Sequence, residues 1–322
     1  MKTRITQILG IQYPIIQAPM SWLTSAELVA SVSNAGGLGV LGVNAGQSTI
    51  TPSIDETIER MRAEIRKVKA LTDKPFGLNI LFAEDMTFSN PMIELAIEEK
   101  VPVLAVVSVD DSDYSDTLAR VKQHGIKVML RPAVPTVARA KLAEQRGVDV
   151  LVVTGFDSGG VAPSSQIGTF SIVPLIADNT NLPILVAGGV GDVRGVRASF
   201  ALGAEGVYVG TAFMTVKENP LADNLKAKIL DHTAENLHLF QSTMGMLRSI
   251  PTTLTAELVA MNQQGTDLTE VAQKQFSRKS EQSGLISGDA EHEYINAGSA
   301  VSFAKNIRSA KALVEDLMQD FV

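Results

Sequence analysis

Short apolar runs recur along the chain, and each ends at a glycine, a proline or a polar residue. Runs that are apolar at every position, rather than at alternate positions, are typical of parallel strands covered on both faces. Eight strands are predicted in this way, at residues 15–18, 39–41, 76–81, 103–107, 128–130, 150–154, 184–187 and 207–209.

The segments between these strands have the pattern of amphipathic helices, with apolar residues three and four positions apart. Seven helices are predicted, at residues 25–35, 55–71, 91–99, 113–124, 136–146, 169–179 and 193–202. Regular alternation of buried strands with helices predicts an α/β protein whose sheet closes on itself. The expected fold is therefore a (β/α)8 TIM barrel.

The pattern changes after the eighth strand. Residues 217–287 are predicted to be helical and polar, without a strand, and a last helix is predicted at residues 299–321. This last helix would return to complete the barrel. We therefore expect a barrel formed by residues 1–211 and 288–322, with residues 212–287 as a helical insertion after the eighth strand, a lid over the catalytic face.

Two neighbouring strand ends carry the clearest binding signal. The seventh strand stops at Gly188 and Gly189, and the eighth stops at Gly210 and Thr211. Glycine lets backbone N–H groups approach a phosphate because no Cβ stands in the way. The loops after strands seven and eight are a frequent phosphate site in TIM barrels. We predict a phosphate cradle here; the alternative is that these glycines only permit tight turns.

The end of the first strand and a polar residue in the third are further candidates. Pro19, between Ala18 and Met20, sets a rigid loop across the mouth of the barrel, where a flat ring could lie over Ala18 and against Met20. Asn79 offers a donor and an acceptor, as a ring's heteroatoms or a ribityl chain would require. The structural alternatives are a plain strand end and a hydrogen-bonded core amide.

Two more strand ends carry candidate binding residues. Arg131 ends the fifth strand and could offer a cation to a ring carbonyl or to a phosphate, or it could be solvated or salt-bridged. Ser158, Gly159 and Gly160 follow the sixth strand, where the glycines would let the backbone approach a planar ligand closely.

The sequence indicates no strong catalytic residue. His232 and His238 fall in the predicted lid and could overhang the site, although solvated helix histidines are commoner, and Arg131 is a further weak candidate. No pair of histidines or carboxylates stands at ligand spacing near a strand end, so no metal site is expected.

Composition and charge exclude several classes of partner and of catalytic group. Twenty-eight basic and 35 acidic residues give a net charge of −7, and no basic stripe with aromatic residues is present, so nucleic acid is not an expected partner. The absence of cysteine excludes disulfides, thiolate metal sites and a cysteine nucleophile. No apolar run approaches the ~20 residues that span a bilayer, and no signal segment is evident, so we expect no membrane association and a cytoplasmic location.

Several motifs carry a family resemblance. They are YPIIQAPM (13–20), NAGGLGVLG (34–42), KPFGLN (74–79), AGGV (187–190), LGAEGVYVGT (202–211) and NAGS (296–299). Together they extend over essentially the whole chain, and they resemble the nitronate monooxygenase (2-nitropropane dioxygenase) family. Flavin-dependent enoyl-acyl-carrier-protein reductase II and related NADH:quinone reductases share this pattern. The resemblance implies a non-covalent FMN, with its phosphate at the two glycine turns and its isoalloxazine between residues 18–20 and 158–160.

One position departs from the family pattern. Members commonly have Ala-Gly-Gly-His after the sixth strand, with the histidine acting as a base or a positioning group, whereas this chain has Val161 after Ser158, Gly159 and Gly160. Valine cannot transfer a proton or hydrogen-bond an anion. The histidine that would usually abstract a proton from a neutral nitroalkane, or deliver one to an enoyl thioester, is therefore absent from this position. A nitronate is already an anion, so its oxidation could survive the change.

We therefore expect an FMN-dependent oxidoreductase that oxidises alkyl nitronates with molecular oxygen, in which Arg131 or a lid residue holds the anionic substrate. One alternative is an NAD(P)H-dependent flavin reductase that acts on an enoyl thioester or a quinone. Another is a non-catalytic barrel that binds FMN or a different phosphate ligand. The expected partners are small molecules, namely the substrate, oxygen and, for a reductase, NAD(P)H. A homodimer formed through the lid is compatible with the sequence.

Overall fold

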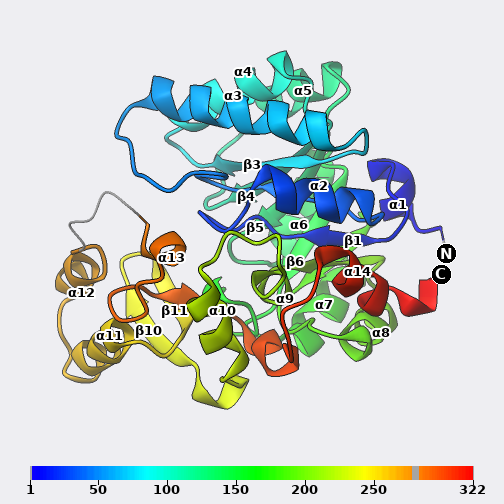
Figure 1. Cartoon of the computed structure of the whole chain (residues 1–322). Coiled ribbons are helices and arrows are strands. Elements are labelled where there is room, and N and C mark those ends of the chain that lie inside the picture. Colours follow the sequence, from blue (N-terminus) through cyan, green and yellow to red (C-terminus); the bar gives the residue numbers. More distant parts are fainter. Residues whose placement is uncertain (1, 278–282, 322) are drawn as a thin grey trace.

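Eight parallel strands form the centre of the computed structural model, which describes residues 2–277 and 283–321 (Figure 1). Their sequence in the sheet is β1-β9-β8-β6-β5-β4-β3-β2. The bounds are β1 (Ile15–Gln17), β2 (Val40–Leu41), β3 (Gly77–Phe82), β4 (Val103–Ser108), β5 (Lys127–Pro132), β6 (Val150–Thr154), β8 (Ile184–Ala187) and β9 (Gly206–Val209). Leu38 closes the ring beside β1, since its N–H donates to Ile15 at 3.0 Å and its carbonyl accepts from Gln17 at 2.9 Å. The predicted (β/α)8 barrel is confirmed.

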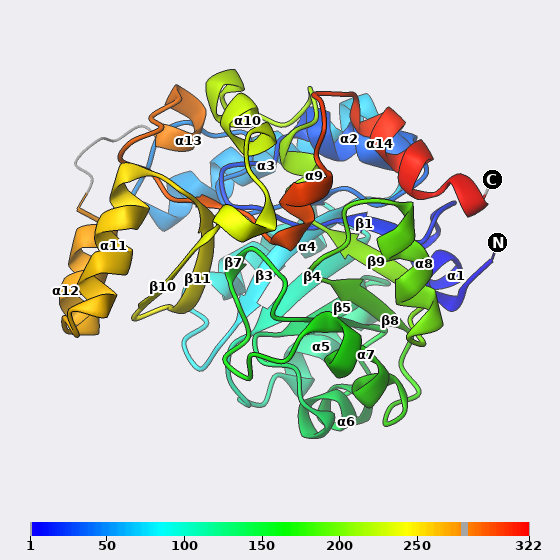
Figure 2. The same cartoon turned by 90° about the horizontal axis from the view of Figure 1, so that it is seen from below.

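Helices cover the outside of the barrel (Figure 2). They are α2 (Ala26–Asn34), α3 (Ile54–Leu71), α4 (Ser89–Glu98), α5 (Ser115–Gln123), α6 (Val137–Gln145), α7 (Thr169–Ala177), α8 (Val193–Ala201) and α14 (Ala310–Leu317), whereas α1 (Arg4–Leu9) lies across the amino-terminal end. Ser25, Ser53, Thr136 and Asp192 begin α2, α3, α6 and α8, because each side chain accepts a hydrogen bond from an N–H of the first turn. None of the helices within the described ranges is both long and apolar enough to cross a bilayer.

The alternation of side chains divides the apolar residues of the barrel into two layers. Ala105 of β4 points into the barrel, whereas its neighbours Leu104 and Val106 pack under the helices. Ile5 and Leu9 of α1 join the interior layer and close the amino-terminal end of the barrel. The carboxyl ends of the strands are therefore the open end, where ligands bind in this fold.

The predicted lid, residues 212–287, contains strands as well as helices. Its elements are α9 (Thr211–Met214), α10 (Asp223–Leu230), η1 (Ala234–Asn236), β10 (His238–Ser242), β11 (Gly245–Ile250), α11 (Thr253–Gln263), α12 (Leu268–Gln275) and α13 (Gly284–Ser287). β10 and β11 form a hairpin, and β11 also pairs with β12 (Ile295–Asn296) and with β7 (Gly160–Val161). We call these four strands the outer sheet. The expectation that this segment carries no strand is wrong.

The burial of β10 explains why the sequence pattern concealed a strand. Phe240 is buried whereas Leu239 and Gln241 are exposed. The alternation of buried and exposed positions that would predict a strand therefore extends over very few residues, in a segment otherwise rich in helix-forming residues. Phe240 and Leu247 of the hairpin pack against Leu258 of α11. These tertiary contacts, rather than local preference, select the strand conformation.

The end of the chain is also more divided than predicted. Instead of one helix over residues 299–321, it has η2 (Ser299–Phe303), α14 and η3 (Gln319–Phe321). Ser309 begins α14 by accepting a hydrogen bond from the first turn. α14 packs against α2 and α8, as expected of the helix that completes the barrel. The outer hairpin β10–β11 and helices α11 and α12 lie at the opposite side from α1 and α14, whereas α9 lies next to α14 (Figures 1 and 2). The division of the chain at residues 212 and 287 stays a prediction.

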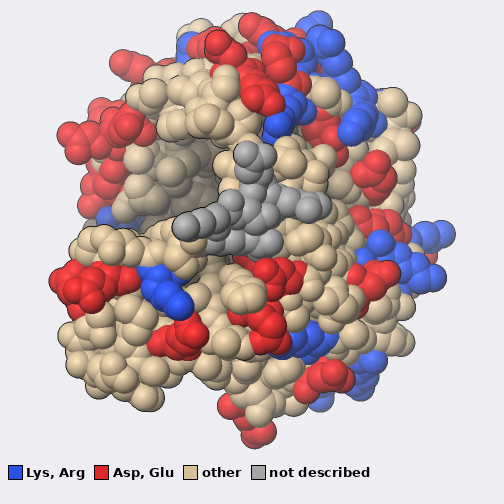
Figure 3. Space-filling view, turned by 60° about the vertical axis from the view of Figure 1, so that its left-hand side comes forward, with Lys and Arg blue, Asp and Glu red and all other residues tan. Residues whose placement is uncertain are grey.

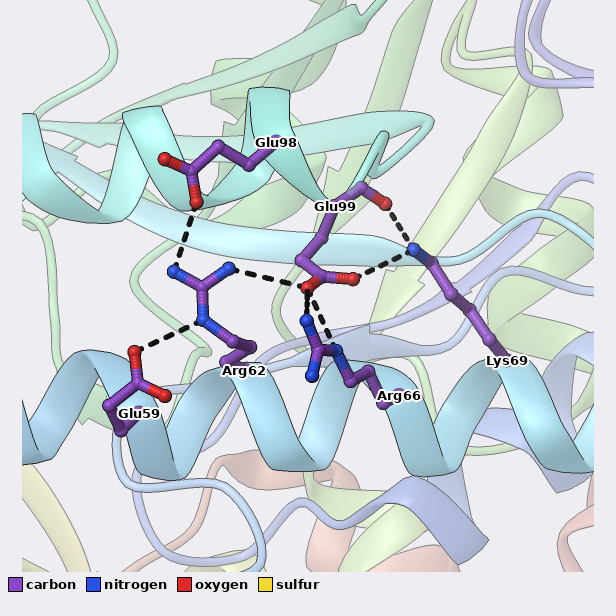
Figure 4. A network of polar contacts seen from close by, with 6 residues as sticks. All are labelled: Glu59, Arg62, Arg66, Lys69, Glu98 and Glu99. Carbon is purple, nitrogen blue, oxygen red and sulfur yellow. Dashed lines mark hydrogen bonds and ion pairs between the residues drawn. The ribbon is translucent and has the colours of Figure 1, made fainter.

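A network of charged side chains joins α3 to the end of α4 (Figure 4). The Glu99 carboxylate lies 2.8 Å from Arg66, 3.1 Å from Lys69 and 3.3 Å from Arg62. Arg62 also pairs with Glu98 at 2.9 Å and with another carboxylate of α3. Burial would raise the pKa of the Glu99 carboxyl, but the hydrogen bonds from Arg66, Lys69 and Arg62 hold it below its ordinary value.

Candidate active site

A cavity of about 650 Å³ opens at the carboxyl ends of the barrel strands, between the barrel and the lid. This volume lies within the roughly 300–1,000 Å³ of ordinary ligand pockets. Figure 3 shows the molecule hollowed on this side, with walls that are mostly neither acidic nor basic. The residues predicted to contact a cofactor all line it: Ala18, Pro19, Met20, Asn79, Arg131, Ser158, Gly159, Gly160, Gly188, Gly189, Gly210 and Thr211. The fold thus brings together residues from six strand ends.

The glycine turns after β8 and β9 have the geometry of a cradle. Gly188 and Gly189 have φ values of 97° and 80°, and a Cβ on Gly188 would lie 3.0 Å from the carbonyl oxygen of Gly155. The turn therefore requires glycine whether or not a ligand binds. Gly210 precedes α9, whose first N–H groups receive no side-chain cap. Uncapped N–H groups beside Thr211 are suited to an anion.

Asp157 fixes the loop after β6, a role that the sequence pattern did not assign. Its carboxylate accepts hydrogen bonds from the backbone and the hydroxyl of Thr169, each at 2.8 Å. Its carbonyl accepts from Ser299 at 3.0 Å. A Cβ on Gly159 would lie 2.5 Å from the backbone of Ala297, so this loop and the turn before η2 can pack together only through glycine. The loop over the cavity is thereby held in one position.

Arg131 is a partly buried cation in the wall of the cavity. Its Nε donates to Thr154 Oγ1 at 2.8 Å, and no carboxylate of residues 2–277 or 283–321 forms an ion pair with it. Burial lowers the pKa of Arg131, and burial raises the pKa of the nearby Tyr208 hydroxyl. Arginine nevertheless stays protonated in proteins. Because a partly buried cation without a partner is unfavourable, this guanidinium is suited to a ligand with negative charge.

Two further polar groups at the cavity have spare hydrogen-bonding capacity. Asn79 Nδ2 donates to the carbonyl of Ala105 at 2.8 Å, so the Asn79 amide is oriented and its oxygen stays available. The Ser158 hydroxyl is buried and has no hydrogen-bond partner within the described part of the chain. Buried polar atoms are normally satisfied, so an orphaned hydroxyl in a cavity indicates a ligand or water contact.

The histidines of the lid do not reach this cavity. The ring of His238 lies 2.9 Å from the Thr255 hydroxyl, and the ring of His232 lies 2.7 Å from the carbonyl of Lys228. Burial lowers the pKa of His238, so its ring is neutral near pH 7. The hypothesis that either one overhangs the site receives no support from the structure. Among the residues described, no group of three His, Asp or Glu side chains could hold a metal ion.

The cavity wall also includes residues that the sequence analysis missed. Tyr208 comes from β9, while Gln275, Tyr294 and Asn296 come from the lid and the strand that follows it. Tyr208 could have been found, because its strand end was already a candidate. The sequence marks none of the other three as a site residue: Gln275 ends α12, Tyr294 precedes β12, and Asn296 opens the NAGS motif, which indicates a family but no role in the cavity.

The fold and this site define an enzyme of the TIM-barrel oxidoreductase class. The family model for nitronate monooxygenase matches residues 2–320. A probable nitronate monooxygenase of Staphylococcus haemolyticus is 34% identical over 272 residues, covering 72% of this chain and 72% of that protein. The chain therefore belongs to the nitronate monooxygenase family, and an enzyme is confirmed over a non-catalytic barrel.

Other relatives show the range of this family. The structure of FabK from Thermotoga maritima has a TM-score of 0.85 and 27% identity, and the match covers 100% of this chain and 96% of that one. A Mycobacterium tuberculosis protein, named a dehydrogenase of a hydroxy-methyl-oxo-octahydroindene-carboxyl-CoA, is 27% identical over 100% of this chain and 96% of its own. A nitroalkane oxidase from Streptomyces ansochromogenes shares the fold, with a TM-score of 0.80 at 21% identity.

Proposed function

We propose that this protein is an FMN-dependent oxidoreductase that oxidises alkyl nitronates with molecular oxygen. Arg131 carries the proposal, because a partly buried guanidinium that has no ionic partner among residues 2–277 and 283–321 fits an anionic group in the cavity. Members of this family are typically flavoproteins. The orphaned Ser158 hydroxyl and the glycine cradle both fit such a cofactor.

The lining residues divide into groups that suit the parts of FMN. Gly188, Gly189, Gly210 and Thr211 would hold the phosphate through backbone N–H groups and a hydroxyl. The loops at residues 18–20 and 158–160 would enclose the ring, with Asn79 and Arg131 available to its polar edge. FMN, when bound, supplies the electron transfer between substrate and oxygen. The protein supplies orientation, charge and exclusion of water.

The mouth of the cavity supports a substrate with an apolar part. Ile50, Met244 and Phe276 line it, and their side chains are 60%, 50% and 53% exposed. They come from the loop before α3, from the β10–β11 turn and from the end of α12. Large apolar side chains gathered at a pocket are typical of a binding surface. We infer that they contact the alkyl chain of the nitronate.

A second candidate function rests on the same mouth. FabK and the CoA-ester dehydrogenase among the relatives bear names of enzymes that act on acyl groups, and an apolar mouth also suits an acyl chain. This candidate is an NAD(P)H-dependent flavin reductase that acts on an enoyl thioester or a quinone. Val161 weighs against it, because valine cannot deliver a proton to the reduced product.

Anaerobic stopped-flow measurements separate the two candidates. The FMN-loaded protein is mixed in parallel with NADH, NADPH and an alkyl nitronate, and bleaching of the flavin is followed. We expect fast, saturable bleaching by the nitronate and slow bleaching by both pyridine nucleotides. Fast bleaching by NADH or NADPH would select the reductase, and a protein that cannot be loaded with FMN would reject both.

A further inference from the structure

Two short strands lie end to end along one edge of β11, directly over the cavity. Gly160 of β7 stands opposite Arg248, and Asn296 of β12 stands opposite the next residue, Ser249. Segments more than 130 positions apart in the sequence thus become neighbours. A Cβ placed on Gly160 would lie 3.5 Å from Asn296 Nδ2. The Asn296 amide is therefore beside the position where family members commonly have Gly-His.

The Asn296 side chain is free to bind a ligand. It is exposed, it lines the cavity, and it makes no hydrogen bond within the described part of the chain. Its neighbour Ile295 is fully buried on the opposite face of β12, packed with Leu23 and Met214. Because successive side chains of a strand point to opposite faces, the burial of Ile295 directs Asn296 to the cavity side.

Val161 contributes to packing, and its side chain has no group that could take part in proton transfer. It pairs across the outer sheet with Leu247 and packs against the apolar cluster that contains Phe240. The residue at the usual histidine position thus helps to hold the outer sheet on the barrel. Arg248, opposite Gly160, directs its guanidinium to the carbonyls of Phe156 and Ser158, so among these paired residues Asn296 is the polar one that lines the cavity.

We propose that the Asn296 amide donates a hydrogen bond to a charged oxygen of the substrate, in the place left by the missing histidine. The inference rests on the proposed function, because it takes the substrate to be an anion bound against the lid wall. An amide is neutral and cannot accept a proton from carbon. The site therefore binds a nitronate but does not deprotonate a neutral nitroalkane.

The test is a binding titration that does not depend on turnover. Nitrate, a planar anion with three oxygens, is titrated into the full-length FMN-loaded protein, and the perturbation of the flavin absorbance is recorded. Loss of one hydrogen bond to a charged group predicts that Asn296→Ala raises the Kd of nitrate about tenfold or more. Asn296→Asp, which keeps the shape and adds a negative charge, raises it further. Both variants keep the Kd of FMN and the melting temperature of the parent.

Asn90→Ala is the matched control, since Asn90 is an exposed asparagine of α4 that does not line the cavity. An unchanged Kd of nitrate in Asn296→Ala would overturn the inference, and so would a weakened Kd of FMN, which would make Asn296 a cofactor contact. Failure of the proposed function is distinguishable. In that case nitrate binding still depends on Asn296, while the parent protein does not oxidise a nitronate.

Discussion

Two regions of this molecule differ in whether their charged side chains have ionic partners. Between α3 and α4, one carboxylate, Glu99, is contacted by Arg62, Arg66 and Lys69 (Figure 4). In the wall of the cavity, one guanidinium, Arg131, has a single hydrogen bond to the Thr154 hydroxyl and no ionic partner among residues 2–277 and 283–321. In the first region, side chains of the protein compensate the charge of the Glu99 carboxylate. In the second, the Arg131 guanidinium keeps donor N–H groups that a ligand could use.

The difference teaches how to separate stabilising polar groups from binding groups. A network such as that of Glu99 contributes to folding, because its charges are compensated within the chain. A partly buried cation without a counter-ion loses hydration and gains no ion pair, so its presence in a cavity fits the proposal that an anionic ligand supplies the missing charge. The orphaned Ser158 hydroxyl in the same cavity follows the same rule.

Replacement of Arg131 tests this comparison with the largest expected effect. Arg131→Met removes the cation in the wall of the cavity, and we expect kcat/KM for an alkyl nitronate to fall roughly 10²–10³-fold. Stability should stay the same or rise by about 1 kcal/mol, because an unpaired, partly buried charge is lost. Arg66→Met in the Glu99 network is the control and should leave kcat/KM unchanged. Steady-state kinetics and urea unfolding measure both; equal kinetics for the two variants would contradict the assignment.

Gly188→Ala tests the cradle. The residue has a φ of 97°, and the added Cβ would lie 3.0 Å from the Gly155 carbonyl oxygen, so we expect a stability loss of about 1–2 kcal/mol and an FMN Kd raised tenfold or more. Gly125→Ala is the matched control, since Gly125 has a φ of 76° with nothing within 4 Å of the new Cβ. Fluorescence titration should show normal FMN affinity for that control. An equal FMN Kd in both variants would exclude Gly188 from the cradle.

Glu99→Gln tests the other half of the comparison. Removal of the carboxylate leaves Arg66 and Lys69 without their ionic partner, while Arg62 keeps Glu98, and we expect a stability loss of about 1–2 kcal/mol at pH 7 with unchanged kinetics. The folded pKa of Glu99 is lowered, so its contribution is fully present above the ordinary carboxyl pKa of about 4.3 and is lost as the pH falls through the folded pKa. Urea unfolding at pH 7 and pH 3 should therefore show a difference that shrinks in acid. A constant difference would contradict the linkage.

Val161→His has the smallest expected effect. The imidazole would sit opposite Leu247 against the apolar cluster of Phe240, so we expect a stability loss of about 1 kcal/mol. Beside Asn296 it would add a base to the site, and turnover of a neutral nitroalkane should rise a few-fold above the parent. Oxygen consumption measures that turnover. If it stays at the parent level, the missing histidine does not account for the selectivity for nitronates that we propose.

Much of the cavity could be predicted because its residues carry their own local signal. Gly188 and Gly210 each end an apolar run, and in a barrel all such ends meet at one face. Asn79 is a polar residue within an apolar strand and Arg131 stands near the end of another, which is unusual enough to identify them. The structure places all of these in one cavity, and their contacts with FMN stay a prediction.

The wall contributed by the outer sheet could not be predicted. Asn296 opens the NAGS motif (296–299), but nothing in that motif indicates that it lies beside Gly160. The hairpin that brings them together depends on the packing of Phe240 and Leu247, which local preference does not reveal. His232 and His238 were considered because of their chemistry, but their rings face partners within the lid.

The sequence by itself determined the barrel, the glycine turns and the family, because apolar periodicity and glycine placement act over a few residues. Tertiary structure alone decided that Arg131 has no ionic partner within the described chain and that Asn296 stands beside Gly160. Whether a charge is paired, and which side chain faces it, depends on contacts between segments far apart in the chain. Those contacts are fixed only when the whole core packs.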